Sequence, residues 1–272
     1  MTQMTEQERK RKKPLRALEN NEFIHSSEAR ILRILSEYVY PASVFRTKEV
    51  TDTVVFFGSA RVYPPDDLRH HDDLSGADYG SGSALDQYSR YYVEAMKLAE
   101  GITRWSLDNQ ERLGRRVSLC TGGGPGIMEA ANRGARLAGG DSIGLNIELP
   151  HEQSANPYIS EHLNFNFHYF FMRKYWFLYY IRTLVVFPGG FGTLDELFET
   201  LTLRQTQNIK NRIPVYLYGS DFWKRLVQFD FLAEAGLISR KDLELFSFVD
   251  SVDEALAQIL PVLEEQLMAE PE

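Results

Sequence analysis

The sequence is poor in cysteine. Cys120 is the only residue of this type, so no disulfide bond can form within the chain. A chain without disulfides fits a reducing compartment, and no apolar stretch follows the basic run near the N-terminus. We therefore expect a cytoplasmic protein without a secretory signal. The sequence also lacks any window that approaches the roughly 20 apolar residues of a membrane span, so we expect no membrane partner.

Basic residues are in the minority, with 30 Lys and Arg against 38 Asp and Glu and a formal net charge of -8. Nucleic acids select basic surfaces, so this balance argues against nucleic acid as the main partner. A basic cluster at residues 9–13 indicates a solvated tail, with contact to nucleic acid or an acidic lipid surface as the alternative. An anionic ligand would need locally positive groups in an otherwise acidic protein.

Six short apolar runs alternate with amphipathic helical patterns from Thr53 onward. They cover residues 53–57, 116–120, 142–147, 183–187, 215–218 and 246–249. This order is typical of parallel strands with helices on both faces. It predicts an α/β, Rossmann-like, doubly wound and mainly parallel sheet in one catalytic domain, residues 51–272. Residues 1–50 are expected to form an N-terminal arm and a helix capped by Ser26 or Ser27.

Residues 62–84 interrupt this rhythm with a stretch rich in Pro, Asp, Gly and Ser, which predicts a long surface loop. It contains His70, His71, Asp72 and Asp73, which could bind a metal ion. Adjacent side chains in an irregular loop seldom converge on one ion, so we favour a solvated loop and expect no metal.

The segment TGGGPGIMEAANRGA follows a predicted strand and opens a predicted helix. Glycines let the backbone approach a ligand closely, and the free amides of a helix start carry a partial positive charge. Such a turn can bind an anion without a lysine; a tight turn without a ligand is the alternative. As a dinucleotide fingerprint the segment is defective, because Ile127 replaces the third glycine, and this weakens an oxidoreductase assignment.

The segment PGGFGTLDELFE repeats the arrangement after the strand at 183–187, with a helix expected from Thr193. The two glycine-rich turns face one crevice if their strands are neighbours in the sheet. Thr193 and Glu196 fit a capping box, yet Glu196 at this helix start also lies beside any bound phosphate, and the pattern alone favours neither. Arg173, in an apolar and aromatic helix, needs an oxygen partner such as a phosphate or carboxylate; the alternative is a side chain that extends to solvent.

Three segments in this order resemble the LONELY GUY family of phosphoribohydrolases, whose members are often labelled lysine decarboxylases: GGGPGIMEAANRGA, the RK of FFMRKYW, and PGGFGTLDE. The resemblance implies a homodimer or larger homo-oligomer that hydrolyses a nucleoside 5′-monophosphate to a free base and ribose 5-phosphate, without a cofactor. It implies catalytic roles for Arg173 and Glu196. With the glycine turns, it implies substrate or phosphate contacts from Gly58, Ser59, Gly122, Gly123, Gly124, Gly126, Glu129, Lys174, Gly189, Gly190, Gly192 and Thr193.

Three positions differ from plant members of this family, which act on cytokinin nucleotides. Phe170 and Phe171 replace a Met-His pair, and Glu129 in GIMEA is more similar to bacterial nucleotide nucleosidases. We therefore expect an AMP-like substrate, with a cytokinin riboside monophosphate as the alternative.

Two other classes of protein compete with this interpretation. A non-enzymatic nucleotide or molybdenum-cofactor carrier would use the same glycines but would not need Glu196 or Arg173, so the presence of both favours an enzyme. A pyridoxal enzyme needs a Schiff-base lysine, and the sequence places none at a glycine turn.

Overall fold

The computed structural model describes residues 14–64, 86–148, 155–208 and 213–269 of the chain. Contacts divide the chain into two units, Met1–Ala42 and Ser43–Glu272. The larger unit contains the sheet and the candidate site.

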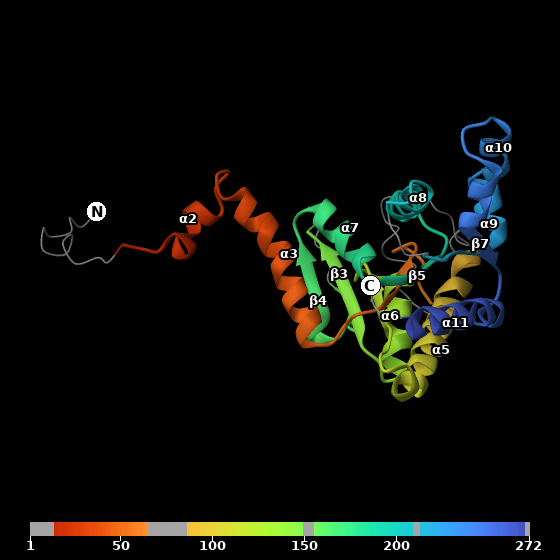
Figure 1. The fold of residues 1–272 in the computed structure, drawn as a ribbon, viewed down its shortest axis with the longest axis horizontal. Helices are drawn as coiled ribbons and strands as arrows, with labels where there is room; N and C mark the ends of the chain where they lie inside the picture. Colours follow the sequence, from red (N-terminus) through yellow and green to blue (C-terminus); the bar gives the residue numbers. More distant parts are fainter. Residues whose placement is uncertain (1–13, 65–85, 149–154, 209–212, 270–272) are drawn as a thin grey trace, which may run out of the picture. The chain divides into compact units, whose positions relative to one another are not determined.

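The sheet of the larger unit has seven parallel strands in the order β4-β3-β2-β1-β5-β6-β7 (Figure 1). The strands are β1 (Thr53–Phe57), β2 (Ser118–Thr121), β3 (Ser142–Ile147), β4 (Asn164–Phe167), β5 (Ile181–Val186), β6 (Val215–Tyr218) and β7 (Phe246–Val249). The α-helices of the described residues are α2 (Asn21–Ile24), α3 (Arg30–Thr47), α5 (Arg90–Leu113), α6 (Ile127–Leu137), α7 (Phe170–Tyr179), α8 (Phe191–Gln205), α9 (Ser220–Leu226), α10 (Phe229–Glu234) and α11 (Val252–Met268). Short 3-10 helices are η1 (Ala17–Glu19), η2 (Asp86–Tyr88), η3 (Glu161–Leu163) and η4 (Arg240–Leu245).

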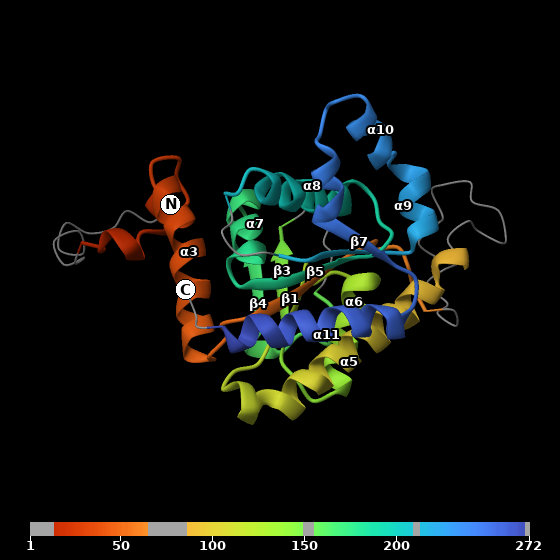
Figure 2. The same ribbon diagram turned by 45° about the vertical axis from the view of Figure 1, so that its right-hand side comes forward.

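Helices cover both faces of this sheet, with α5, α6 and α11 on one face and α7 and α8 on the other (Figure 2). The predicted Rossmann-like, doubly wound α/β fold is therefore confirmed. Strand order reverses direction at β1, which pairs with β2 on one side and with β5 on the other. In open parallel sheets such a reversal is the place where ligand crevices form.

The core lies on both faces of the central strands because neighbouring residues of a strand point to opposite sides. Phe56 is buried in the apolar cluster formed with α5, α6 and α11. Phe57 points the other way and packs edge-on against Phe177 of α7, with ring centroids 4.7 Å apart. The continuous burial of β1 explains why its sequence shows no polar alternation.

Strand β4 is a seventh strand that the sequence analysis does not expect. Its residues Asn-Phe-Asn-Phe alternate between exposed and buried, and it pairs only with β3 at the edge of the sheet. Strand β4 buries every second side chain at the edge of the sheet, so it lacks the continuous apolar run that marks a central strand such as β1. Phe165 contributes to an aromatic cluster with Phe45, at a centroid distance of 5.1 Å.

Helices α5 and α6 approach each other very closely at Gly134. A Cβ on this residue would collide with the carbonyl oxygen of Met96 and would lie 2.9 Å from the amide nitrogen of Glu100, both in the backbone of α5. Because α6 follows the first glycine-rich turn, this contact fixes the helix that begins at the site.

The smaller unit contains α2 and most of α3. Helix α3 begins at Arg30, later than the predicted cap at Ser26 or Ser27. Arg33 closes the preceding turn, since its Nη1 donates to the carbonyl oxygens of Ile24 and Ser26 at 2.7 Å. Three large apolar residues of α3, Ile31, Leu35 and Tyr38, are exposed. Among the described residues, no helix combines the length and the apolar character needed to cross a membrane.

Substitution Gly134→Ala is expected to lower the free energy of unfolding by about 1–3 kcal/mol. The added methyl group meets the α5 backbone, which cannot rotate aside, and this cost exceeds the gain of roughly 1 kcal/mol in helix propensity. Chemical denaturation of the purified protein measures the change.

Gly101→Ala in α5 is the matched control, because its Cβ would meet the movable side-chain end of Leu256 at 3.0–3.1 Å. We expect this variant to stay within about 1 kcal/mol of the wild type. Equal stability of the two variants would mean that the close approach of α5 and α6 does not constrain the fold.

Candidate functional site

The backbone of Ser59 connects the two glycine-rich turns. Its N–H donates to the carbonyl oxygen of Pro188 at 3.0 Å, and its carbonyl oxygen accepts from the N–H of Ile127 at 3.1 Å. Strand β1 lies between β2 and β5, so the two turns do not follow neighbouring strands. They are brought together by the turn after β1, which contains Ser59.

The turn after β2 is filled by contacts within the protein. A Cβ on Gly123 would collide with the side chain of Asn146, and one on Gly126 would collide with the backbone of Ser59. Asn156 Nδ2 donates to the carbonyl oxygen of Gly123 at 3.1 Å. Tight packing therefore accounts for these glycines without a ligand. The cavity described below is lined by none of the predicted glycines of this turn, Gly122, Gly123, Gly124 and Gly126.

Helix α8 begins at Phe191, two residues before the predicted start, and Gly190 precedes it as the N-cap. Thr193 is therefore the third residue of the helix and Glu196 the sixth. The capping box suggested by the TLDE pattern does not form, and no side chain caps this helix. Glu196 is thus not used as a helix cap.

Three backbone amides at the start of α8 have no acceptor among the described residues. Leu194 is the first residue whose N–H finds an acceptor in the turn, the carbonyl oxygen of Gly190 at 3.0 Å. Within the described parts of the chain, no group accepts a hydrogen bond from the amides of Phe191, Gly192 or Thr193. Unpaired amides at a helix start favour an anion.

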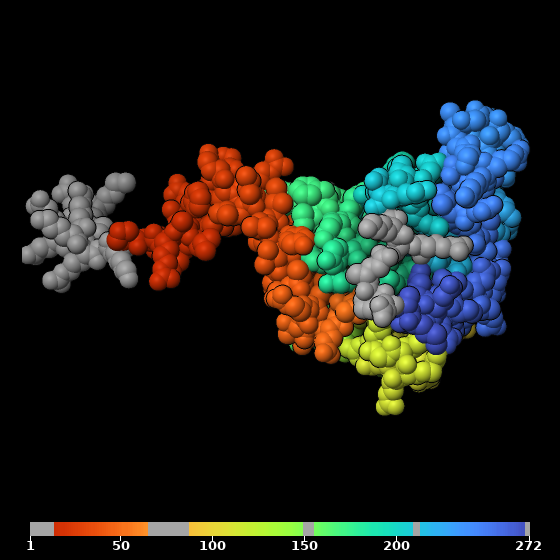
Figure 3. All heavy atoms as spheres, in the orientation of Figure 1, coloured from red at the N-terminus to blue at the C-terminus, as the bar shows by residue number. Residues whose placement is uncertain are grey.

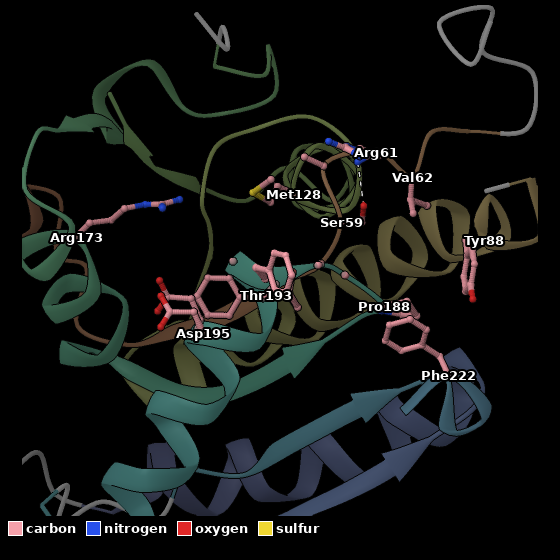
Figure 4. A pocket seen from close by; sticks show the side chains of 18 of the residues that line it. Ser59, Arg61, Val62, Tyr88, Met128, Arg173, Pro188, Thr193, Asp195 and Phe222 are labelled. Atoms are coloured by element: carbon pink, nitrogen blue, oxygen red, sulfur yellow. Dashed lines mark hydrogen bonds between the residues drawn. The ribbon is translucent and has the colours of Figure 1, made fainter. Parts of the chain in front are cut away.

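A cavity of about 690 Å³ opens beside these amides at the carboxyl ends of β1 and β5. This volume is in the range of roughly 300–1,000 Å³ that is usual for small-molecule sites. Figure 4 shows Arg173 and Asp195 toward one end of the cavity, Tyr88 and Phe222 toward the other, and Ser59 between them. The predicted site residues that line it are Gly58, Ser59, Arg173, Gly189, Gly190, Gly192, Thr193 and Glu196.

Arg173 is largely buried and is held by backbone oxygens at two strand ends. Its Nε donates to the carbonyl oxygen of Leu145 at 2.7 Å, and its Nη2 to that of Gly122 at 3.4 Å. The guanidinium also lies over the Phe177 ring, 5.1 Å from the centroid. Burial lowers the pKa of Arg173, and the charge of Glu196 acts in the opposite direction. Two carbonyls therefore anchor a cation that still has donors for a ligand.

Glu196 is buried, with 8% of its surface exposed, and lines the cavity. Within the described residues, no group donates a hydrogen bond to its carboxylate. Burial raises its pKa to about 7, while the charges of Lys174 and Arg173 act to lower it. A carboxyl group that titrates near neutrality can exchange a proton at physiological pH.

Lys174 points to the outer side of α8 and does not line the cavity. Its Nζ lies 2.8 Å from Asp195 Oδ2 and 2.7 Å from Glu199 Oε2. The expected contact with substrate or phosphate is thus replaced by two carboxylates that flank Glu196 on the helix. Neutralising these carboxylates limits their repulsion of the Glu196 charge.

Glu129 also lies outside the cavity, contrary to the expectation of a ligand contact. It is buried in the first turn of α6, where its Oε1 accepts from the Tyr92 hydroxyl at 2.9 Å. Tyr92 comes from α5, so the pair contributes to the packing of these two helices.

Several apolar cavity residues are not predicted from the sequence. They are Phe57, Val62, Tyr88, Met128, Phe170, Phe191 and Phe222. Phe191 lies within the PGGFGT segment, and Phe170 precedes Arg173 by one helical turn. Their closeness in sequence to predicted site residues could therefore have identified both as cavity residues. Tyr88 and Phe222 lie outside any motif.

The four residues considered as metal ligands, His70, His71, Asp72 and Asp73, lie outside the described residues. Among the residues that the structure describes, no group of three or more potential ligands is close enough to hold a metal ion. The cavity is lined by no lysine of the described residues, so the Schiff-base residue of a pyridoxal enzyme has no counterpart there.

Comparisons with known proteins relate this chain to one family and to one type of fold. Residues 128–259 match the model of a family described as "Possible lysine decarboxylase". Members of the LONELY GUY family often carry that label, so the match supports the resemblance at the level of the family. Among curated proteins, none matches the chain.

Two solved structures from other organisms are similar to this chain. One is the molybdenum cofactor carrier protein of Chlamydomonas reinhardtii, with 19% identity, a TM-score of 0.45 and coverage of 79% of this chain and 99% of the other. The other is the molybdenum cofactor binding protein of the phototrophic bacterium Rippkaea orientalis, with 14% identity, a TM-score of 0.47 and coverage of 78% and 98%. Similarities this distant say nothing about ligand or activity.

The raised pKa of Glu196 predicts a loss of stability as the pH rises. The folded protein holds this proton up to a pH of about 7, whereas the unfolded chain releases it near 4.5. Between these values the folded state binds more protons, so the free energy of unfolding falls with increasing pH. Glu196→Gln removes this titration, and the variant should gain stability relative to the wild type between about pH 5 and about pH 8.

Denaturant titrations at both ends of this range measure the effect. Glu234→Gln, at an exposed position at the end of α10, controls for the loss of a surface charge. If Glu196→Gln and the wild type differ by the same amount at both pH values, then burial does not destabilise the charged form of Glu196.

Proposed function

We propose that this chain hydrolyses the N-glycosidic bond of a nucleoside 5′-monophosphate of the AMP type to a free base and ribose 5-phosphate. The observation that supports this most is the environment of Glu196. Its carboxylate is buried and receives no hydrogen bond from the described residues. It lines a cavity together with the partly buried Arg173 and the helix amides that find no acceptor among these residues. A carboxylate in such a place suits a reaction that develops positive charge on a sugar.

The phosphate of the substrate is placed at the start of α8. Three unpaired amides, from Phe191 to Thr193, and the positive end of the helix dipole offer hydrogen bonds and charge to an anion. The Ser59 side chain lines the same part of the cavity and offers a hydroxyl donor. These donors support the binding of an anionic ligand by a protein with a net negative charge.

With the phosphate in this position, the sugar lies along α8 toward Glu196. A water oxygen forms a bond to C1′ while the bond between C1′ and the base nitrogen breaks. The electron pair of the broken bond leaves with the base, whose nitrogen takes up one proton from solvent. Glu196 stabilises the positive charge on the sugar and accepts the proton that the attacking water loses. It returns this proton to solvent after the reaction.

Arg173 assists by position and charge. Its hydrogen bonds to the carbonyl oxygens of Leu145 and Gly122 fix the guanidinium before substrate binds. The remaining N–H groups can donate to the departing base and stabilise the electron pair that it carries away. A fixed donor of this kind needs no reorganisation during the reaction.

The substitutions Glu196→Gln and Arg173→Ala test this assignment. Glu196→Gln should lower kcat with AMP at least about a hundredfold, which is ~2.7 kcal/mol of barrier, while the protein stays folded. Arg173→Ala should also lose activity because the leaving base has lost its donor. Release of adenine and ribose 5-phosphate from AMP is measured on purified protein, with Glu234→Gln as the control.

A nucleotide carrier on the same fold predicts a different result. The wild type would bind AMP without releasing adenine. Because the wild type would then have no hydrolysis rate, neither substitution could lower it. Adenine release at a near-normal rate from Glu196→Gln would remove this residue from the mechanism.

Lys174 is expected to act on the reaction through the pKa of Glu196. Replacing it with Met leaves Asp195 and Glu199 without their countercharge beside Glu196, so the pKa of Glu196 should rise above about 7. Because the carboxylate is the active form, the acid limb of the pH profile of kcat/KM should move to higher pH. Activity should recover at alkaline pH.

Lys174→Arg keeps the positive charge and serves as the control, with an acid limb close to that of the wild type. A loss of activity by the same factor at every pH would instead fit direct binding of substrate by Lys174. The pH profile therefore separates an electrostatic role from the contact expected on sequence.

A further inference from the structure

Two phenylalanines at the starts of neighbouring helices leave large apolar rings open to the cavity. Phe170 is the first residue of α7 and Phe191 the first of α8, and both line the cavity that contains Arg173 and Glu196. Phe170 is 53% exposed and Phe191 is 93% exposed. Both helices lie at the surface of the larger unit (Figure 3). These exposed rings therefore contribute little buried apolar area to the stability of the fold.

Their positions relate them to the reacting groups. Phe170 precedes Arg173 by three residues in α7, so the two side chains share one face of that helix. Phe191 is the residue at which the unpaired amides of α8 begin, and Glu196 follows in the next turn. The aromatic rings thus belong to the same two helix starts that carry the proposed catalytic residues.

The ligand proposed for this cavity contains one flat aromatic part, its base. Stacking of a base on an aromatic side chain contributes about 1–3 kcal/mol, and it needs no particular pattern of donors and acceptors. We propose that Phe170 and Phe191 hold the nucleobase by stacking and so set the preference of the site for the base. This inference rests on the proposed function, because it takes a nucleoside 5′-monophosphate as the ligand.

Separate binding measurements of the nucleotide and of its sugar phosphate test this role. The Glu196→Gln background prevents turnover, and calorimetric titrations with AMP and with ribose 5-phosphate are then made for Phe170→Ala, Phe191→Ala and the pair. Each single substitution should raise Kd for AMP about tenfold, which corresponds to ~1.4 kcal/mol. Kd for ribose 5-phosphate, which has no base, should change less than about twofold, a shift under ~0.4 kcal/mol.

Phe231→Ala is the matched control, because Phe231 on α10 is also well exposed, at 60%, and does not line the cavity. It should leave both affinities unchanged. The preference for AMP over a pyrimidine nucleotide should narrow in the Phe170 and Phe191 variants, since the larger base offers more stacking area.

An unchanged Kd for AMP, or a parallel loss of affinity for ribose 5-phosphate, would overturn the stacking role. Because the readout is binding, it is independent of catalysis. Binding of AMP without release of adenine by the wild type would overturn only the proposed hydrolysis. No binding of AMP to the wild type would overturn both proposals.

Discussion

The two backbone hydrogen bonds of Ser59 hold the site together. Its N–H donates to the carbonyl oxygen of Pro188 before α8, and its carbonyl oxygen accepts from the N–H of Ile127 at the start of α6. Ser59 follows strand β1 at the centre of the sheet, where the strand order reverses. Backbone groups that lose their partners in a partly buried place cost free energy, so the turns are constrained to one arrangement. The cavity exists because three strand ends are fixed to one another in this way.

Positive charge in this site comes from the backbone of the α8 start and from two arginines that line the cavity, Arg61 and Arg173. Helix amides provide partial positive charge at the α8 start, and carbonyl oxygens rather than carboxylates anchor Arg173. Glu196 is left without a hydrogen bond from the described residues, and burial raises its pKa to about 7. The charged form of Glu196 therefore destabilises the folded state, although the side chain lines a cavity. Such groups are typical of functional sites, where reactive side chains often lower the stability of the fold.

The sequence predicted the fold well because the central strands are continuous apolar runs, as in β1. Strand β4 escaped because asparagine alternates with phenylalanine at the sheet edge. The sequence also indicated the glycine-rich turn after β2. It could not show why glycine is needed there, because a close protein neighbour excludes a Cβ just as a ligand would. In the structure these neighbours are Asn146 and Ser59. Glu129 and Lys174 could not be placed, since their partners come from other helices and only the folded chain brings them together.

The contact at Gly134 also decides which walls of the cavity can change. Helix α6 lies directly on the α5 backbone there, so the side of the cavity that carries Met128 has no room to move outward. The opposite rim is formed by the first turns of α7 and α8, where Phe170 and Phe191 are exposed and meet no such obstacle. Substitutions that adapt the cavity to larger or smaller ligands would therefore accumulate in that rim, while the α6 side keeps its position.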